Sequence, residues 1–281
     1  MLAYTSDETR GRVAPDGRWH GDVCQRAWPD EDDVEDLSPE VRARLSRTWL
    51  GQAATEARVA VSFAAIHGSL GRLGADPELT ALAGRAVDDE HRHAALAEEL
   101  AGRYAGSQVG PYRSLPAQMP AHPDAETDAI RDALWVVGQC ALNETLATAY
   151  LDAARQGAKT KSARFAIREL MEDEIDHARI GWAFLAGLSV KEKAPLADWI
   201  LPLTVCNLRE WNRLSLPEDD ALWAHGVPPF ETARDAIREA LSGVLLPGFA
   251  HVGVETAALE QWVASGAPLE GPFEGRTGLQ A

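Results

Sequence analysis

The sequence predicts an all-α protein. Alanine is abundant, runs of β-branched residues are few, and no stretch keeps the alternating polar and apolar pattern of a strand for long. Long segments instead start at helix-capping residues and end at glycines. The chain has 281 residues, of which 46% are hydrophobic, so it is long enough for one large globular domain.

Charge and targeting features narrow the classes of partner. The net charge of −16 argues against nucleic acids and anionic membranes. No apolar run approaches the roughly 20 residues of a membrane-spanning helix, and the N-terminus lacks the basic-then-apolar order of a signal peptide. We therefore expect a cytoplasmic protein without a membrane partner. The 3 cysteines are far apart and odd in number, which predicts neither a disulfide framework nor a zinc ribbon.

The helix boundaries follow from capping residues. Ser38 and Asp76 are each followed by proline, a pattern typical of helix N-termini, because the side-chain oxygen accepts a backbone hydrogen bond and proline needs no donor there. Gly157 is typical of a helix end, and Thr160 starts the next helix. The predicted helices span residues 38–70, 76–104, 124–156, 160–186, 195–215, 229–246 and 255–265.

These helices divide the chain into three regions. Residues 1–37, marked by glycines and prolines, are predicted to form an irregular, solvated arm over the helices. Residues 38–187 form a core of four helices, in which the glycines and prolines of 105–123 predict a long connection between the second and third. Residues 188–281 are predicted to form a helical extension packed on this core, so we expect no second independent domain.

A repeated pattern of charged residues points to the chemistry. Asp-Glu-x-x-His occurs at residues 89–93 and again at 173–177, and its glutamate and histidine project to one side of a helix. One helix upstream of each copy stands a solitary glutamate. Glu56 is the only acid within 41–70, and Glu144 is the only acid within 133–151. One Glu-x-x-His is a weak signal, but two copies that each have such a partner are a strong one.

Numbering alone predicts that these side chains meet. In an antiparallel pair of helices, residues equally far from the turn lie at the same height. Glu56 and residues 90–93 are centred near 73–74, and Glu144 and residues 174–177 are centred near 159–160, which are the predicted turns. Buried carboxylates need compensating cations, and two divalent ions would balance four of them. We therefore predict one dinuclear site with the following ligands: Glu56, Glu90, His93, Glu144, Glu174 and His177. Iron or manganese suits such ligands, and zinc can also fit.

This ligand pattern resembles that of the ferritin-like di-iron carboxylate proteins, in which two helices give a glutamate each and two give Glu-x-x-His. The resemblance covers residues 45–186. The segments RAVDDEHRHAALAEELAGRY and CALNETLATAYLDA look like those of little-characterised bacterial ferritin-like domain proteins. It implies an antiparallel four-helix bundle, with 105–123 as the long crossover between helices 2 and 3.

The resemblance also implies individual roles. Glu90 and Glu174 would bridge or chelate the metals, with Glu56 and Glu144 as outer carboxylates and one histidine, His93 or His177, on each metal. Asp89 and Asp173 would accept the free N–H of a ligand histidine. Thr148, one turn after Glu144, is a weaker candidate for a catalytic residue, because some oxygen-activating relatives have a threonine there. His91 and Asp176, adjacent to ligands, are expected at the surface, and Cys140 in the core or beside the site.

The leading hypothesis for function is an oxidoreductase. Two iron ions, or manganese or a mixed pair, would activate O2 to oxidise a small organic substrate, with electrons from an external donor such as a reductase or ferredoxin. The tryptophans of the C-terminal helices, Trp199, Trp211 and Trp223, could roof a substrate pocket or simply complete the core. The oligomeric state stays open, and a homodimer is among the alternatives.

Other functions remain open at this point. An iron-handling ferroxidase would use the same ligands, although the irregular arm and the C-terminal helices fit a storage cage poorly. A peroxide-reducing protein similar to rubrerythrin would need an outside electron donor, because rubredoxin-type cysteine pairs are absent from the sequence. The metals could also be purely structural. A closed apolar pocket at the metals would favour an oxygenase, and a polar channel would favour iron transit.

Overall fold

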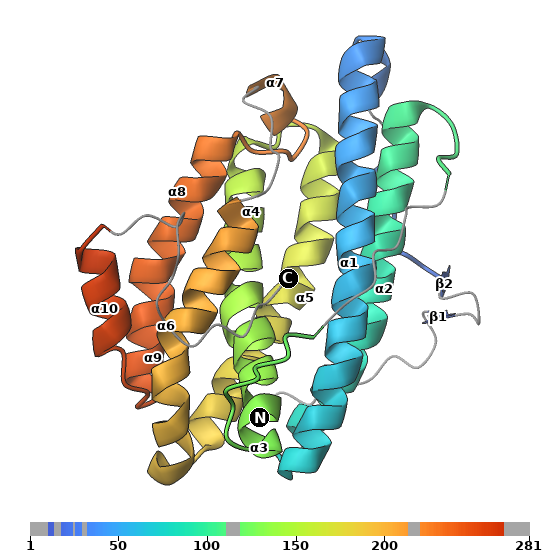
Figure 1. Ribbon diagram of the computed structural model, residues 1–281. Helices are drawn as coiled ribbons and strands as arrows, with labels where there is room; N and C mark the ends of the chain where they lie inside the picture. Colours follow the sequence, from blue (N-terminus) through green and yellow to red (C-terminus); the bar gives the residue numbers. More distant parts are fainter. Residues whose placement is uncertain are drawn as a thin grey trace.

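The computed structural model describes residues 11–13, 18–24, 26–29, 33–110, 119–212 and 220–266 (Figure 1). The fold is mainly helical, which confirms the predicted all-α class. In the described residues, strands occur only as a short antiparallel pair, β1 (Gly11–Val13) and β2 (Trp19–Gly21). Strands of this length are too short to show alternation in the sequence. None of the described helices has the length and apolarity needed to cross a bilayer.

Long helices pack in a ring. Helix α1 packs along α2 and also contacts α3, α2 contacts α5, and α5 contacts both η2 and α4. The third member of the ring consists of α3, the π-helix η2 and α4 in direct succession. The bounds are α1 (Pro39–Leu73), α2 (Pro77–Ala105), α3 (Asp128–Val136), η2 (Val137–Asn143), α4 (Glu144–Gly157) and α5 (Lys161–Gly187). Before α1 lies the 3-10 helix η1 (Asp33–Asp36).

The predicted capping residues start the first two helices. The Ser38 side chain accepts a hydrogen bond from the backbone N–H of Val41, and Asp76 accepts one from Glu78. Gly74 ends α1 at φ +64°, a left-handed conformation that glycine adopts without a steric cost. The predicted turn between α1 and α2 is therefore confirmed.

The third helix starts later than predicted, at Asp128 instead of residue 124. Thr127 caps it by accepting a hydrogen bond from the N–H of Ile130. The preceding residues are held in a different way. Trp135 and Arg131 reach back from α3 and donate to the carbonyls of Pro120 and Ala121, which fixes this segment against the helix.

The C-terminal helices lie beside the ring. Helix α8 contacts α4, and α6 contacts α3 and η2, so this part covers the face of the third helix away from α2 (Figure 1). Helix α6 begins at Val190, not at the predicted residue 195, because Ser189 and Glu192 form a capping box. The bounds are α6 (Val190–Asn212), α7 (Asp220–Trp223), α8 (Phe230–Ala240), η3 (Leu241–Leu245), α9 (Leu246–His251) and α10 (Ala257–Ala264).

The apolar core is divided into two clusters. One contains Phe63 of α1 and Phe184 of α5, and the other contains Trp49 of α1 and Ile167 of α5. Between them, at the level of Glu56 on α1, the interior of the ring is occupied by buried charged residues. The apolar clusters therefore seal this polar layer from both ends.

Helix α5 touches the backbone of η2 at Gly181. A Cβ atom placed on Gly181 would lie 2.2 Å from the amide nitrogen of Ala141 and 2.7 Å from the carbonyl carbon of Cys140. A π-helix carries an extra residue per turn and widens locally. The absent side chain of Gly181 makes room for that widened turn next to the polar layer.

We predict that Gly181→Ala destabilises the protein by about 1–3 kcal/mol, because the new methyl group would overlap backbone atoms that cannot move independently. Gly71→Ala is the matched control, since a Cβ there meets nothing within 4 Å and the helical backbone suits alanine. Urea unfolding monitored by circular dichroism measures both. Equal stability of the two variants would contradict the proposed close contact.

Candidate metal centre

The structure brings all the predicted ligands into the polar layer. Glu56 comes from α1, Glu90 and His93 from α2, Glu144 from the start of α4, and Glu174 and His177 from α5; each side chain is buried. The equal heights expected from the turns are thus realised.

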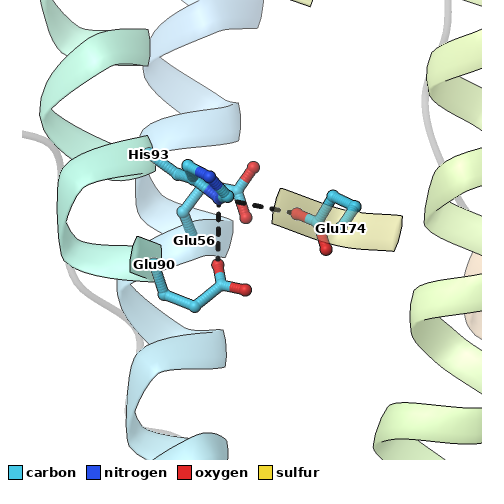
Figure 2. Close-up of side chains that lie close together, drawn as sticks. All are labelled: Glu56, Glu90, His93 and Glu174. Atoms are coloured by element: carbon cyan, nitrogen blue, oxygen red, sulfur yellow. Dashed lines mark ion pairs between the residues drawn. The ribbon is translucent and has the colours of Figure 1, made fainter. Parts of the chain in front are cut away.

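One half of the layer is a compact group of possible ligands. Glu56, Glu90, His93 and Glu174 each offer an atom within 4.8 Å of the others (Figure 2). The Nδ1 atom of His93 lies 3.7 Å from Glu90 Oε2 and 3.5 Å from Glu174 Oε1. The possible ligand atoms of these four residues therefore face a shared point between α1, α2 and α5.

The other half shares two of these carboxylates. The Nδ1 atom of His177 lies 3.0 Å from Glu90 Oε1 and 3.3 Å from Glu174 Oε2. Glu144 shares a hydrogen bond with Glu174. The two imidazole rings are 5.9 Å apart between centroids. Glu90 and Glu174 therefore stand between the two histidines, each with one oxygen toward either side.

The aspartates of the two motifs hold the histidines in a crossed arrangement. Asp173 Oδ2 lies 3.0 Å from Nε2 of His93, and Asp89 Oδ2 lies 3.5 Å from Nε2 of His177. Each aspartate thus serves the histidine of the opposite motif, a pairing that spacing along one helix cannot reveal. With Nε2 held by an aspartate, the Nδ1 atom of each histidine is directed at the carboxylates.

The two solitary glutamates each receive a hydrogen bond from a glutamine. Gln52 donates to Glu56 over 2.5 Å, and Gln139 donates to Glu144 over 2.6 Å. Gln52 stands four residues before its glutamate, as one turn of α-helix requires, but Gln139 stands five before, because η2 lies between them. Sequence reasoning missed both donors, and an α-helical register would have hidden Gln139.

Arg92 connects the layer to the N-terminal arm. Its guanidinium donates to Asp173 and, over 3.1 Å, to the carbonyl of Val23. Arg26 of the arm in turn donates to Glu169 of α5 over 2.7 Å. Val23 is half-buried and Arg26 is exposed, so this part of the arm lies against the helices and stays partly solvated. No pattern in residues 1–37 foretold this docking.

Electrostatics favours a protonated cluster when no cation is bound. Burial raises the pKa values of Glu56 and Glu144 well above the usual glutamate range. The neighbouring carboxylates Glu90 and Glu174 raise both pKa values further. Burial acts in the opposite direction on His93, but Asp173 and the nearby glutamates outweigh it and raise its pKa well above the usual value. The pKa of His177 is raised in the same way, with Asp89 as partner.

The residues fit divalent metal ions. Both carboxylate oxygens of Glu90 and the Nδ1 atom of His93 are buried without a hydrogen-bond partner in the described part of the chain. Leaving such atoms unpaired is costly, and coordination of a cation would remove that cost. Carboxylate oxygens with imidazole nitrogens suit iron or manganese, and also zinc.

Three further residues near the site have other roles. The Thr148 hydroxyl donates to the backbone carbonyl of Glu144 over 2.8 Å, and Thr148 does not line the cavity described below, so its placement gives no support to a catalytic role. Cys140 lies buried in η2, where burial raises the pKa of its thiol. The His91 imidazole is half-buried on the side of α2 away from the cluster, in place of the surface position expected.

A cavity of about 1150 Å³ reaches the cluster from the side of α1, η2 and α6, and Glu56, Glu144 and Glu174 form part of its wall. Trp199 and Trp211 line it, in agreement with one of the two roles considered for these residues. Trp223 instead donates to the carbonyl of Ala153 and packs against Gly157. The wall is mixed, with glutamine, arginine and glutamate side chains beside the aromatic rings, so it matches neither the closed apolar pocket nor the polar channel considered from the sequence.

We predict that metal affinity rises with pH. The raised pKa values of the two glutamates and both histidines mean that the folded, metal-free site holds protons that metal ions must displace. Each displaced proton contributes up to about tenfold per pH unit below the folded pKa. The folded protein also holds the histidine protons more tightly than the unfolded chain does. The metal-free protein therefore loses stability as pH rises above 6.5, where the unfolded histidines release their protons. Competition of Mn²⁺ binding with a chelating dye from pH 6 to 8.5 measures the first effect, and a pH-independent affinity would contradict it.

Comparisons with known proteins do not bear on this site. No protein-family model, no curated protein and no solved structure matches the chain. The resemblance described from the sequence therefore stays a prediction. The chemistry of this chain has to be inferred from the arrangement of its own side chains.

Proposed function

We propose that this chain is a ferritin-like oxidoreductase that holds two iron ions, or manganese or a mixed pair, and uses O2 to oxidise a small organic substrate. The observation that carries the proposal is the position of Glu90 and Glu174 between two histidines, with a large cavity at the same cluster. The ring of α1, α2, η2–α4 and α5 is compatible with a ferritin-like bundle. Residues 111–118, within the predicted crossover, lie outside the described residues.

The side chains divide naturally between two ions. Glu56 and His93 would hold one ion, Glu144 and His177 the other, and Glu90 and Glu174 would bind both. Two divalent charges would balance the four carboxylates, so the buried layer would be neutral. When bound, the ions would supply the electrons and the Lewis acidity for reaction with O2.

The chain itself would control the substrate's approach. Glu56, Glu144 and Glu174 face the cavity, so a substrate would meet the cluster on the side of the solitary glutamates. Gln52 and Gln139 hold two of these carboxylates in place. On the opposite side, Asp89, Asp173 and Arg92 close the cluster against the arm. This arrangement gives substrate access on one face and fixed ligands on the other.

The size of the cavity favours an organic substrate over iron transit. At about 1150 Å³ it is as large as pockets for drug-sized ligands and far larger than the passage of one ion needs. Iron handling, peroxide reduction and a structural metal pair use the same ligands and are alternatives. The experiment below separates the first and the last of them from the proposal. An external electron donor such as a reductase or ferredoxin completes the proposal.

We predict that the wild-type protein binds two metal ions per chain and that Glu144→Ala and His177→Ala each bind about one or fewer, because each change removes a ligand that no neighbour can replace. Metal content by mass spectrometry of the reconstituted proteins tests this. Glu126→Ala and His67→Ala are matched controls at exposed positions and should bind as wild type does. Two ions per chain in either test variant would show that the ligand assignment is wrong.

The same proteins separate the alternatives. Wild-type protein loaded anaerobically with ferrous iron is mixed with O2, and oxygen consumption is followed with and without a chemical reductant. Repeated turnover with reductant supports the oxidoreductase, and growth of a ferric core supports iron handling. Two bound irons that leave O2 unconsumed would identify a structural site and refute the proposal.

A further inference from the structure

We infer that the cavity binds an organic carboxylate with an aromatic or otherwise apolar body, and that Arg47 receives the carboxylate while the body extends along the tryptophan wall toward the metal centre. The inference rests on the proposed function, which it supplies with a substrate class. Four features of the cavity support this assignment: the charge of its lining, the lack of a helical ion-pair partner for Arg47, its aromatic walls and the spacing along α1.

With two divalent ions bound, the cavity would be positively charged in an acidic protein. Arg44, Arg47 and Arg58 line its α1 side, and among the described lining residues Glu210 is the one acid outside the metal cluster. With two divalent ions bound, the cluster's own four carboxylates would be neutralised. The lining therefore has an excess of cations, although the chain as a whole has a net charge of −16. Such local fields favour anionic ligands.

Arg47 and Arg58 of α1 differ from several other surface arginines of the molecule. Arg103, Arg131, Arg155 and Arg179 each pair with an acid three or four residues away on their own helix. Arg47 and Arg58 have no acid three or four residues away on α1, because the only acid within 41–70 is Glu56, which is buried in the cluster. Arg47 is exposed, and no ion pair joins it to a described residue. Its guanidinium is thus available to a ligand, and a guanidinium binds a carboxylate through two parallel hydrogen bonds.

The remaining walls suit an aromatic or apolar body. Trp135 and Trp211 use their indole N–H groups on the carbonyl of Pro120 and the side chain of Asn143, so the rings are fixed and offer apolar faces. The Tyr150 ring contacts Trp211 at a tilt of 43°, with 5.5 Å between ring centroids. Rigid aromatic walls bind apolar ligand surface at little entropic cost.

His122 adds no charge to the wall near Trp199. This residue is 2% exposed, has a left-handed backbone with φ 41°, and meets the Trp199 ring edge-on at 5.5 Å. Burial, together with the nearby Arg131, lowers the pKa of His122 to about 4, so the imidazole is neutral at physiological pH. The cationic end of the cavity is therefore the α1 side alone, which fixes the orientation of an anionic ligand.

The spacing along α1 sets the length of the ligand. Arg47 precedes Glu56 by nine residues, or about 14 Å along the helix axis. A carboxylate at Arg47 leaves that distance for the body before the metal centre. Arg58 stands only two residues after Glu56, so a carboxylate bound there would have no such length between itself and the metal centre.

Calorimetric titration of the metal-loaded protein with phenylbutanoate, phenylbutanol and phenylbutyl phosphate tests the inference. We expect phenylbutanoate to bind more tightly than the alcohol, and Arg47→Gln to weaken the acid about tenfold or more while leaving the alcohol unchanged. Arg164→Gln removes an exposed arginine that does not line the cavity and should change neither affinity. Thermal melting of each variant verifies that the fold is intact.

Each other outcome overturns a specific claim. Equal binding of acid and alcohol, or undiminished binding of the acid to Arg47→Gln, refutes the carboxylate site. If the phosphate ester binds more tightly than the acid, the site prefers another anion, which also refutes the carboxylate site. Metal content measured on the same samples distinguishes failure of the carboxylate site from failure of the proposed function. Two metals without acid binding refutes this inference alone, whereas Arg47-dependent binding to a protein that takes up no metal refutes the proposed function alone.

Discussion

The burial of four carboxylates and two imidazoles in one layer is the constraint on which the rest of the structure depends. Isolated buried charges cost many kcal/mol, so the layer has to carry either protons or cations. The raised pKa values of Glu56 and Glu144 show the first solution in the chain alone. The oxygens of Glu90, which accept no hydrogen bond from a described residue, suit the second. Apolar clusters on both sides keep water from weakening these interactions.

The layer has two different faces. On one, crossed aspartates hold the histidines, and Arg92 joins Asp173 to the arm through Val23. On the other, glutamines hold the carboxylates that border the cavity. A rigid support opposite an accessible face is what a reacting centre requires, because the ligands must keep their geometry while another molecule approaches.

The two halves of the layer are alike in composition but not in backbone. In α1 the glutamine and glutamate are one α-helical turn apart, whereas η2 separates Gln139 from Glu144 by five residues. The widened turn is accommodated only because α5 has no side chain at Gly181. The interval from glutamate to motif also differs, with 34 residues between Glu56 and Glu90 and 30 between Glu144 and Glu174, a difference of about one helical turn. Local backbone geometry thus produces matching hydrogen bonds from unequal sequence spacing.

The sequence by itself determined the helical class and the N-termini of α1 and α2, because capping and helical periodicity are local. It also determined that the six predicted ligands meet, because two turns fix the heights of whole helices. These ligands are Glu56, Glu90, His93, Glu144, Glu174 and His177. Only the tertiary structure decided which aspartate serves which histidine, where the arm docks, and where the cavity opens. The π-helix and the Thr127 cap at the start of α3 also escaped the sequence. The crossed pairs, the docked arm and the cavity depend on contacts between segments far apart in the chain, and such contacts leave no periodic pattern in the residues that make them.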